Sequence, residues 1–151
     1  MKVSESFVVP ESRASVWEVV GNVERVARCL PGVEDVTPLD DNHWNVRVTQ
    51  SLGPLTATFD AKMHVTEQQP TQSISFAATG RTVRGAAGNV RLTNTVRLED
   101  EVDGGTRVLL EADVAMGGML GSVGQKVIGR QATAAARQFA EALERELRNN
   151  A

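Results

Sequence analysis

The sequence predicts an α+β fold, in which a curved, antiparallel sheet of seven strands wraps around one long C-terminal helix. Two observations support this prediction. From Val33 to about residue 114, apolar residues alternate with polar ones, which is the period of half-buried strands. From about Met119 to Asn149, the apolar residues recur every three or four positions, which is the period of an amphipathic helix. About 31 helical residues would span roughly 46 Å, so this helix has to lie across the whole concave face of the sheet.

The N-terminal part of the chain predicts one strand and two short helices. Residues 2–9 alternate loosely and end at Pro10, which is typical of a first strand. A helix of two or three turns follows, with Ser12 as a candidate cap, and closes at Gly21-Asn22. A second short helix ends at Pro31-Gly32, a pair that suits the two central positions of a type II turn.

Six further strands are predicted after this turn. The clearest covers residues 55–65, where the odd-numbered residues are apolar and the even-numbered ones are polar. The segment Gly80–Gly88 is rich in glycine and is predicted to form a mobile hairpin between two strands. Short turns at such distances favour antiparallel order. The other five strands are expected at residues 34–39, 44–48, 74–78, 90–98 and 108–114.

The composition of the chain restricts its function. A length of 151 residues predicts one domain over residues 1–151. The 16 Lys and Arg and 19 Asp and Glu give a net charge of −3, which provides no positive field for nucleic acid. No apolar stretch approaches the about 20 residues of a spanning helix, and the N-terminus lacks the apolar core of a signal peptide. We therefore expect a cytoplasmic protein that does not bind nucleic acid.

Few side chains are suited to chemistry at neutral pH, since the chain has two His, one Cys and no Tyr. Cys29 has no His or carboxylate placed near it by the sequence, so we interpret it as a small buried hydrophobe. His43 and His64 both fall on the polar face of their strands, and no His, Cys and Asp cluster has the spacing of a metal site. We expect no catalytic residue, no metal and no cofactor.

A run of small residues on the long helix, Ala132 to Ala136, predicts a cavity against the sheet. Small side chains do not fill the space between a helix and a curved sheet, and natural cores do not normally stay empty. We expect Ala135 to face this cavity and its ligand to be apolar. The other apolar side chains expected to line it are Trp44, Phe59, Phe76, Leu110, Val127 and Phe139.

Two amides fall among these apolar positions. Asn94 lies on the apolar face of its strand, and Gln131 lies in the apolar stripe of the long helix. A buried amide that lacks partners costs about 1–3 kcal/mol. Either the two amides satisfy each other or backbone groups, or they point into the cavity and orient a ligand.

The approach to the long helix is rich in glycine and leaves two interpretations open. In one, it is a flexible turn with methionine as a gap filler. In the other, Met116, Met119 and Leu120 contact a partner or a bilayer, while Lys126 and Arg130 meet anionic headgroups.

Four segments together resemble the CoxG family of carbon monoxide dehydrogenase systems, which belongs to the START-like (SRPBCC) superfamily. They are Phe7-Val8-Val9-Pro10 followed by Val16-Trp17, then Val26–Glu34 with its Cys-Leu-Pro-Gly turn, then Leu52-Gly53-Pro54, and Gly117–Gly121 before the last helix. The resemblance covers nearly the whole chain. It implies the helix-grip fold, in which the sheet grips the C-terminal helix.

The resemblance also implies a function. Such a protein is a non-catalytic accessory to a molybdenum hydroxylase of the carbon monoxide dehydrogenase type, and it assists maturation or attachment to the cytoplasmic membrane. Electrons from that enzyme must reach the respiratory quinone pool, so an isoprenoid quinone is a reasonable cavity ligand. Two rival interpretations stay open: an enzyme of the START-like cyclase or dehydratase type, and a chaperone-like interaction module.

Overall fold

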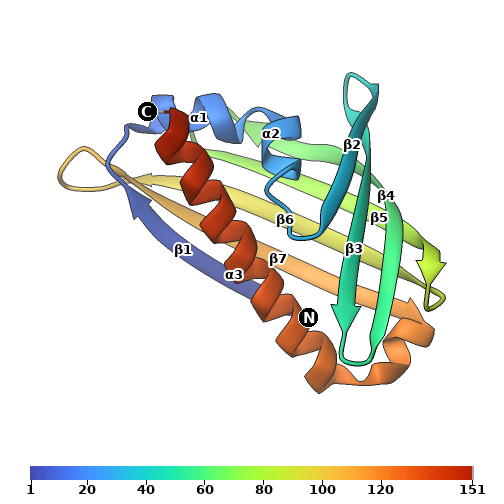
Figure 1. The fold of residues 1–151 in the computed structure, drawn as a ribbon. Coiled ribbons are helices and arrows are strands. Elements are labelled where there is room, and N and C mark those ends of the chain that lie inside the picture. Colours follow the sequence, from blue (N-terminus) through green and yellow to red (C-terminus); the bar gives the residue numbers. More distant parts are fainter. Residues whose placement is uncertain (151) are drawn as a thin grey trace.

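A computed structural model describes residues 1–150 and contains one seven-stranded sheet and three α-helices. The sheet is antiparallel throughout, with the strand order β1-β7-β6-β5-β4-β3-β2 (Figure 1). The predicted fold class is therefore confirmed. The strands are β1 (Lys2–Val9), β2 (Val33–Asp40), β3 (His43–Leu52), β4 (Leu55–Gln69), β5 (Ser73–Gly85), β6 (Gly88–Asp100) and β7 (Thr106–Gly118).

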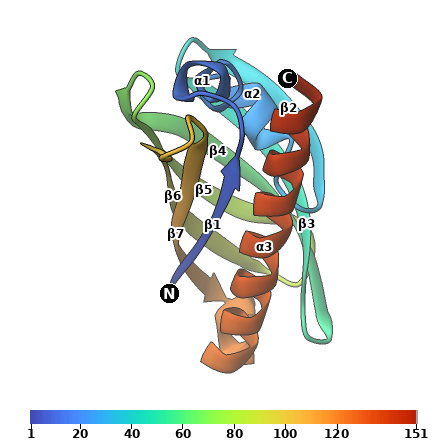
Figure 2. The ribbon, with the colours of Figure 1, turned by 90° about the vertical axis from the view of Figure 1, so that its left-hand side faces the viewer.

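The long helix α3 (Gln125–Asn150) lies across the concave face of the sheet, which curves around it (Figures 1 and 2). Its 26 residues correspond to about 39 Å. The prediction that the helix begins at Met119 is wrong, because residues Met119–Val123 form a separate 3₁₀ helix, η1. Gly124 then adopts a φ of +96°, which lies outside the α-helical region and separates η1 from α3.

Two short helices, α1 (Arg13–Val20) and α2 (Val23–Ala27), close one end of the sheet (Figure 1). The side chain of Ser12 caps α1 by accepting a hydrogen bond from the amide of Ser15. The turn after α2 uses Gly32 at a φ of +77°, and a Cβ there would collide with the carbonyl oxygen of Thr49. The Thr49 amide donates to the Gly32 carbonyl over 2.9 Å, which fixes this turn against β3.

Residues Gly80–Gly88, predicted as a mobile hairpin, are strand almost to the tip. Strand β5 extends to Gly85 and β6 begins at Gly88, so only two alanines form the turn. The amide of Ala86 donates to the carbonyl of Thr56, which ties the tip to the neighbouring strand β4. The predicted hairpin between two strands is confirmed, and its mobility stays a prediction. The paired arms are longer than expected, because pairing in a long curved sheet orders residues whose own preference for strand is weak.

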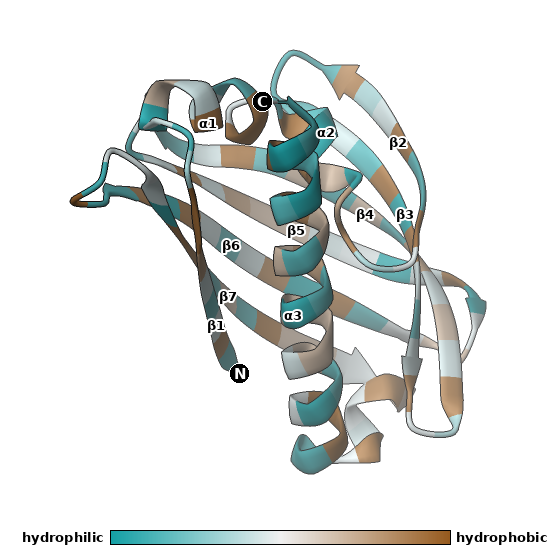
Figure 3. Ribbon diagram, turned by 60° about the vertical axis from the view of Figure 1, so that its left-hand side comes forward, coloured by the Kyte–Doolittle hydropathy of each residue, from teal (hydrophilic) through white to brown (hydrophobic). Residues whose placement is uncertain are grey.

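Two clusters of buried side chains form the core at opposite ends of α3. Along the strands, hydrophobic and hydrophilic residues alternate, so that one face of the sheet packs against the helix (Figure 3). The larger cluster includes Val16, Val20, Ile74, Leu143 and Leu147, and it joins α1, α2 and the C-terminal half of α3 to the sheet. The smaller cluster, of Leu52, Ala57, Phe59, Leu120 and Ile128, lies near η1.

Candidate functional site

An apolar cavity of about 160 Å³ lies between α3 and the concave face of the sheet, between the two core clusters. From α3 it is lined by Gln131, Ala132, Ala135, Ala136 and Phe139. The turn after α2 contributes Leu30 and Pro31. The strands contribute Val3, Val46, Val48, Gln50, Phe59, Ala61, Met63, Ala78, Val90, Leu92, Asn94, Leu110, Ala112, Val114 and Met116.

The cavity exists because side-chain size changes along α3. Ala132, Ala135 and Ala136 face the sheet over one turn, and none of them reaches the opposing strands. Phe139, which is 4% exposed, follows one turn later, and Ile128, equally buried, precedes the alanines by one turn. Large side chains on either side of the alanines therefore hold the helix away from the sheet.

The size of the cavity restricts its ligand. The volume of about 160 Å³ is smaller than the roughly 300–1,000 Å³ typical of sites for drug-sized ligands. Apolar cavities of about 150 Å³ stay dry and take up a molecule such as benzene. This cavity therefore matches a single ring or a short apolar chain, and a larger ligand would have to extend outside it.

Six of the nine residues that the sequence predicted for the site line the cavity: Phe59, Asn94, Leu110, Gln131, Ala135 and Phe139. Three do not. Phe76 lines an adjoining void of about 20 Å³, while Trp44 packs against the larger core cluster and Val127 against the smaller one. The errors have one cause, because periodicity shows which face a residue occupies and not how far along the element the cavity extends.

Several lining residues were missed. Val46 and Val48 share the apolar face of β3 with Gln50, so their alternation could have predicted all three. Leu30 and Pro31 belong to the turn after α2, which periodicity does not place against a cavity.

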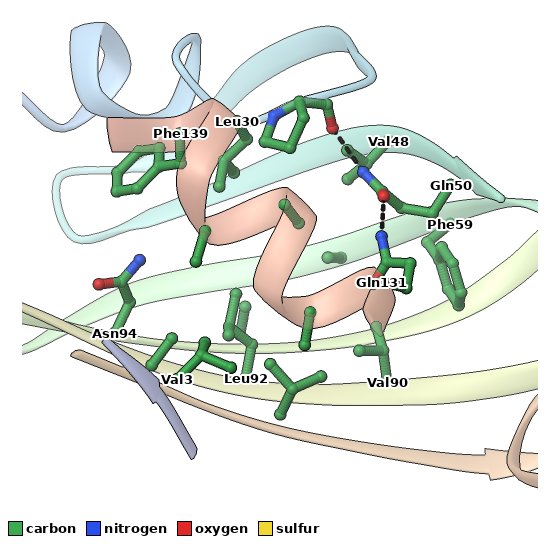
Figure 4. Close-up of a pocket in the computed structure, with 18 of the residues that line it drawn as sticks. Val3, Leu30, Val48, Gln50, Phe59, Val90, Leu92, Asn94, Gln131 and Phe139 are labelled. Carbon is green, nitrogen blue, oxygen red and sulfur yellow. Dashed lines mark hydrogen bonds between the residues drawn. The ribbon is translucent and has the colours of Figure 1, made fainter. Parts of the chain in front are cut away.

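The three amides at the cavity differ in their hydrogen bonding (Figure 4). The Gln131 Nε2 donates to the Gln50 Oε1, and the Gln50 Nε2 donates to the Pro31 carbonyl over 2.5 Å. This chain of hydrogen bonds links α3, β3 and the turn after α2. Asn94 differs, because its Oδ1 is buried and has no hydrogen-bond partner. The two amides do not pair with each other, because Gln131 bonds to the side chain of Gln50 and the Asn94 Oδ1 stays unpaired. That such an amide orients a ligand stays a prediction.

No Asp, Glu, His, Lys, Arg, Cys or Tyr occurs among the described residues that line the cavity. His43 and His64 pair across β3 and β4 and stack with ring centroids 5.5 Å apart, away from the cavity lining. Cys29 is buried in the larger core cluster, and this burial raises the pKa of its thiol to about 11. Within residues 1–150, no group of three or more His, Cys, Asp or Glu side chains could hold a metal ion.

The residues predicted to contact a membrane or partner do not form one exposed group. Met119 is 56% exposed, and Lys126 and Arg130 are exposed as well. Met116 instead lines the cavity. The expectation that Leu120 contacts acyl chains is wrong, because Leu120 is fully buried and packs closely over Gly88. Among the described helices, none has the length and apolarity needed to cross a bilayer.

Known structures share this architecture. A conserved protein from Geobacillus kaustophilus has a TM-score of 0.84 at 17% identity and is similar over 99% of this chain and 96% of its own. A START superfamily protein from Mycobacterium smegmatis has a TM-score of 0.73 at 13% identity, over 99% of both chains. The Zhui aromatase/cyclase from Streptomyces sp. R1128 has a TM-score of 0.68 at 15% identity, over 98% of this chain and 93% of its own. At these identities the likeness shows the fold alone, which is that of the START-like helix-grip proteins.

The family itself is shown by sequence. The model of the CoxG family, a family of carbon monoxide dehydrogenase subunits, matches residues 6–148. The chain belongs to this family, and the resemblance noted from its four sequence segments is confirmed. None of the curated proteins compared with the chain matches it.

Proposed function

We propose that this CoxG family member is a non-catalytic accessory protein of a carbon monoxide dehydrogenase-type molybdenum hydroxylase, and that it binds a lipophilic ligand between α3 and the sheet. The observation that supports this most strongly is the cavity of about 160 Å³, whose lining is apolar except for three amides. An apolar lining offers water few hydrogen-bond partners and favours an apolar guest. Family membership supports the association with the dehydrogenase.

An isoprenoid quinone is the ligand that we favour. The cavity matches one ring in size, so the quinone ring would occupy it and the isoprenoid chain would extend outside. This assignment also follows from the proposed partner, because electrons from such an enzyme must reach the quinone pool.

Peripheral contact with the membrane forms part of the proposal. Met119 is exposed next to α3, and Lys126 and Arg130 are exposed on its first turns. Between Asp113 and Glu141 the chain has no acidic residue, so this end of α3 is cationic. One exposed methionine with a few cationic side chains supports weak, reversible association with an anionic surface, not stable anchoring.

The rival function is an enzyme of the cyclase or dehydratase type, and the aromatase/cyclase among the similar structures shares its fold. Acid–base catalysis needs a titratable side chain within hydrogen-bond reach of the substrate. The described lining has only Gln50, Asn94 and Gln131 as polar side chains, and amides are not ionised near neutral pH and do not act as general acids or bases. The lining therefore favours binding over catalysis.

A complementation experiment tests the proposed function. The gene for this protein is deleted in the organism that encodes it. The deletion strain is then complemented with a gene for the parent protein, for the Ala135→Phe variant or for the Ala134→Phe variant. Ala135 lines the cavity and Ala134 is exposed, so the same substitution fills the cavity in one variant and not in the other. We expect Ala135→Phe alone to impair electron transfer from the dehydrogenase to the membrane. Full activity with stable Ala135→Phe would contradict the proposal.

A further inference from the structure

The amide of Asn94 is an unexplained polar group in an apolar environment. Its Oδ1 is buried without a hydrogen-bond partner, and Asn94 lines both the main cavity and the adjoining void of about 20 Å³. The backbone around it is already used, because Asn94 pairs with Phe76 of β5 on one side and with Ala112 of β7 on the other. A buried polar group without a partner destabilises a fold, so a functional explanation for the unpaired Asn94 Oδ1 is needed.

A water molecule is a poor partner for this amide. The adjoining void is large enough for about one water, but a buried water normally makes about three hydrogen bonds. Asn94 is the only polar side chain among the described residues that line the void, and its neighbours there include Met63, Phe76 and Phe139. A water in this void would therefore lack most of its partners.

The other amides at the cavity do not need a ligand. Gln131 and Gln50 hydrogen-bond to each other, and Gln50 also reaches the Pro31 carbonyl. Figure 4 shows this pair on the opposite side of the drawn cavity from Asn94. A ligand that entered the cavity would thus meet apolar side chains over most of its surface and one free amide at the Asn94 side.

We infer that Asn94 is the polar subsite of this cavity, and that the ligand is a ring-sized apolar group with a carbonyl or hydroxyl that hydrogen-bonds to the Asn94 amide. Half a turn of the amide exchanges its oxygen and nitrogen, so it can accept from a hydroxyl or donate to a carbonyl. This inference rests on the proposed lipophilic site and names the chemistry recognised there.

Three single-ring probes of similar size test the inference: toluene, phenol and benzaldehyde. Their affinities are measured by NMR titration for the parent, for Asn94→Leu and for Asn94→Ala, with Leu92→Met as a control that changes the lining without removing an amide. The preference for each polar ring over toluene is then compared between parent and variant, which cancels the different water solubilities of the probes. Thermal unfolding of each variant shows whether it is folded.

We expect both Asn94 variants to remain folded and to lose about threefold to tenfold of the preference for phenol, benzaldehyde or both, the size of one neutral hydrogen bond. Leu92→Met should keep that preference. The side-chain amide signals of Asn94 should shift with the polar probe and not with toluene. An unchanged preference in folded variants that still bind toluene would overturn the polar subsite and leave the lipophilic cavity standing. A parent that binds none of the three probes would contradict the lipophilic cavity, and this inference with it.

Discussion

The two halves of α3 face the same sheet and have different roles. In the C-terminal half, Phe139, Leu143 and Leu147 are 4%, 0% and 3% exposed and fill the space beneath α1 and α2. One turn towards the N-terminus, Ala132, Ala135 and Ala136 leave a cavity of about 160 Å³. Both stretches are apolar, so side-chain volume, not hydrophobicity, separates the packed core from the wall of the cavity.

The largest expected effect concerns the packed half. Leu143→Ala removes a fully buried side chain and should lower the free energy of unfolding by about 2–5 kcal/mol. Ala136→Val adds apolar volume to the cavity wall, where there is space for it. This substitution should leave the free energy of unfolding unchanged or raise it slightly. Denaturant unfolding measures both variants. Equal destabilisation by the two would mean that the cavity wall is as tightly packed as the core.

Cys29 reports on the same packed end by its reactivity. Burial raises the pKa of its thiol from 9.0 to about 11, so at pH 8 the folded protein should have about a hundredfold less thiolate than the unfolded chain. Alkylation by iodoacetamide should be slow in buffer and fast in denaturant. Between about pH 9 and pH 11 the unfolded chain loses this proton while the folded one keeps it, so Cys29 should lower stability as pH rises through this window. Rapid alkylation of the folded protein at pH 8 would show that this end opens easily.

Filling the cavity tests the difference between the two halves of α3 at the alanine-rich half. Ala135→Phe should weaken the binding of single-ring probes about tenfold or more, while its unfolding temperature stays close to that of the parent, because the added ring enters existing space. Ala134→Phe places the same ring on the exposed face of α3 and should leave the affinity unchanged. Fluorescence or NMR titration gives the affinities. Equal binding by both variants would place the ligand elsewhere.

The smallest effect is expected at the end of α3 that we propose to contact a membrane. Met119→Asp should reduce flotation with anionic liposomes a few-fold without changing stability, since Met119 is 56% exposed. Val102→Asp is the matched control, because Val102 is fully exposed in the acidic turn between β6 and β7, at the other end of these strands. Raising the salt concentration should weaken the parent's binding. Flotation that is equal for both variants and the parent would remove the membrane contact from the proposed function.

Periodicity in the sequence predicted the strands, the helices and the face of each that turns inward. It placed Phe59, Leu110 and Phe139 at the cavity because alternation and helical spacing identify a face directly. It misplaced Trp44 and Val127, because position along an element depends on how far the sheet curves. The predicted start of α3 was wrong because Gly124 adopts a φ of +96°, which ends η1 before α3 begins, and helical spacing does not reveal such a break.

The burial of Leu120 and the partner of Gln131 could not be predicted from the sequence either. Two glycines precede Met119-Leu120, and they indicated a flexible segment. Leu120 nevertheless packs against Gly88 and is fully buried. The bond between Gln131 and Gln50 joins residues 81 positions apart, and no local pattern predicts such a pair.

The most direct test of the central claim is mass spectrometry of the small molecules extracted from the natively purified protein. The parent and Ala134→Phe should release a lipophilic compound in near-stoichiometric amount, and Ala135→Phe should release little of it. An isoprenoid quinone among the extracted compounds would establish the ligand that we favour. Equal amounts from all three proteins, or no lipophilic compound from the parent, would contradict a ligand-binding cavity beneath α3.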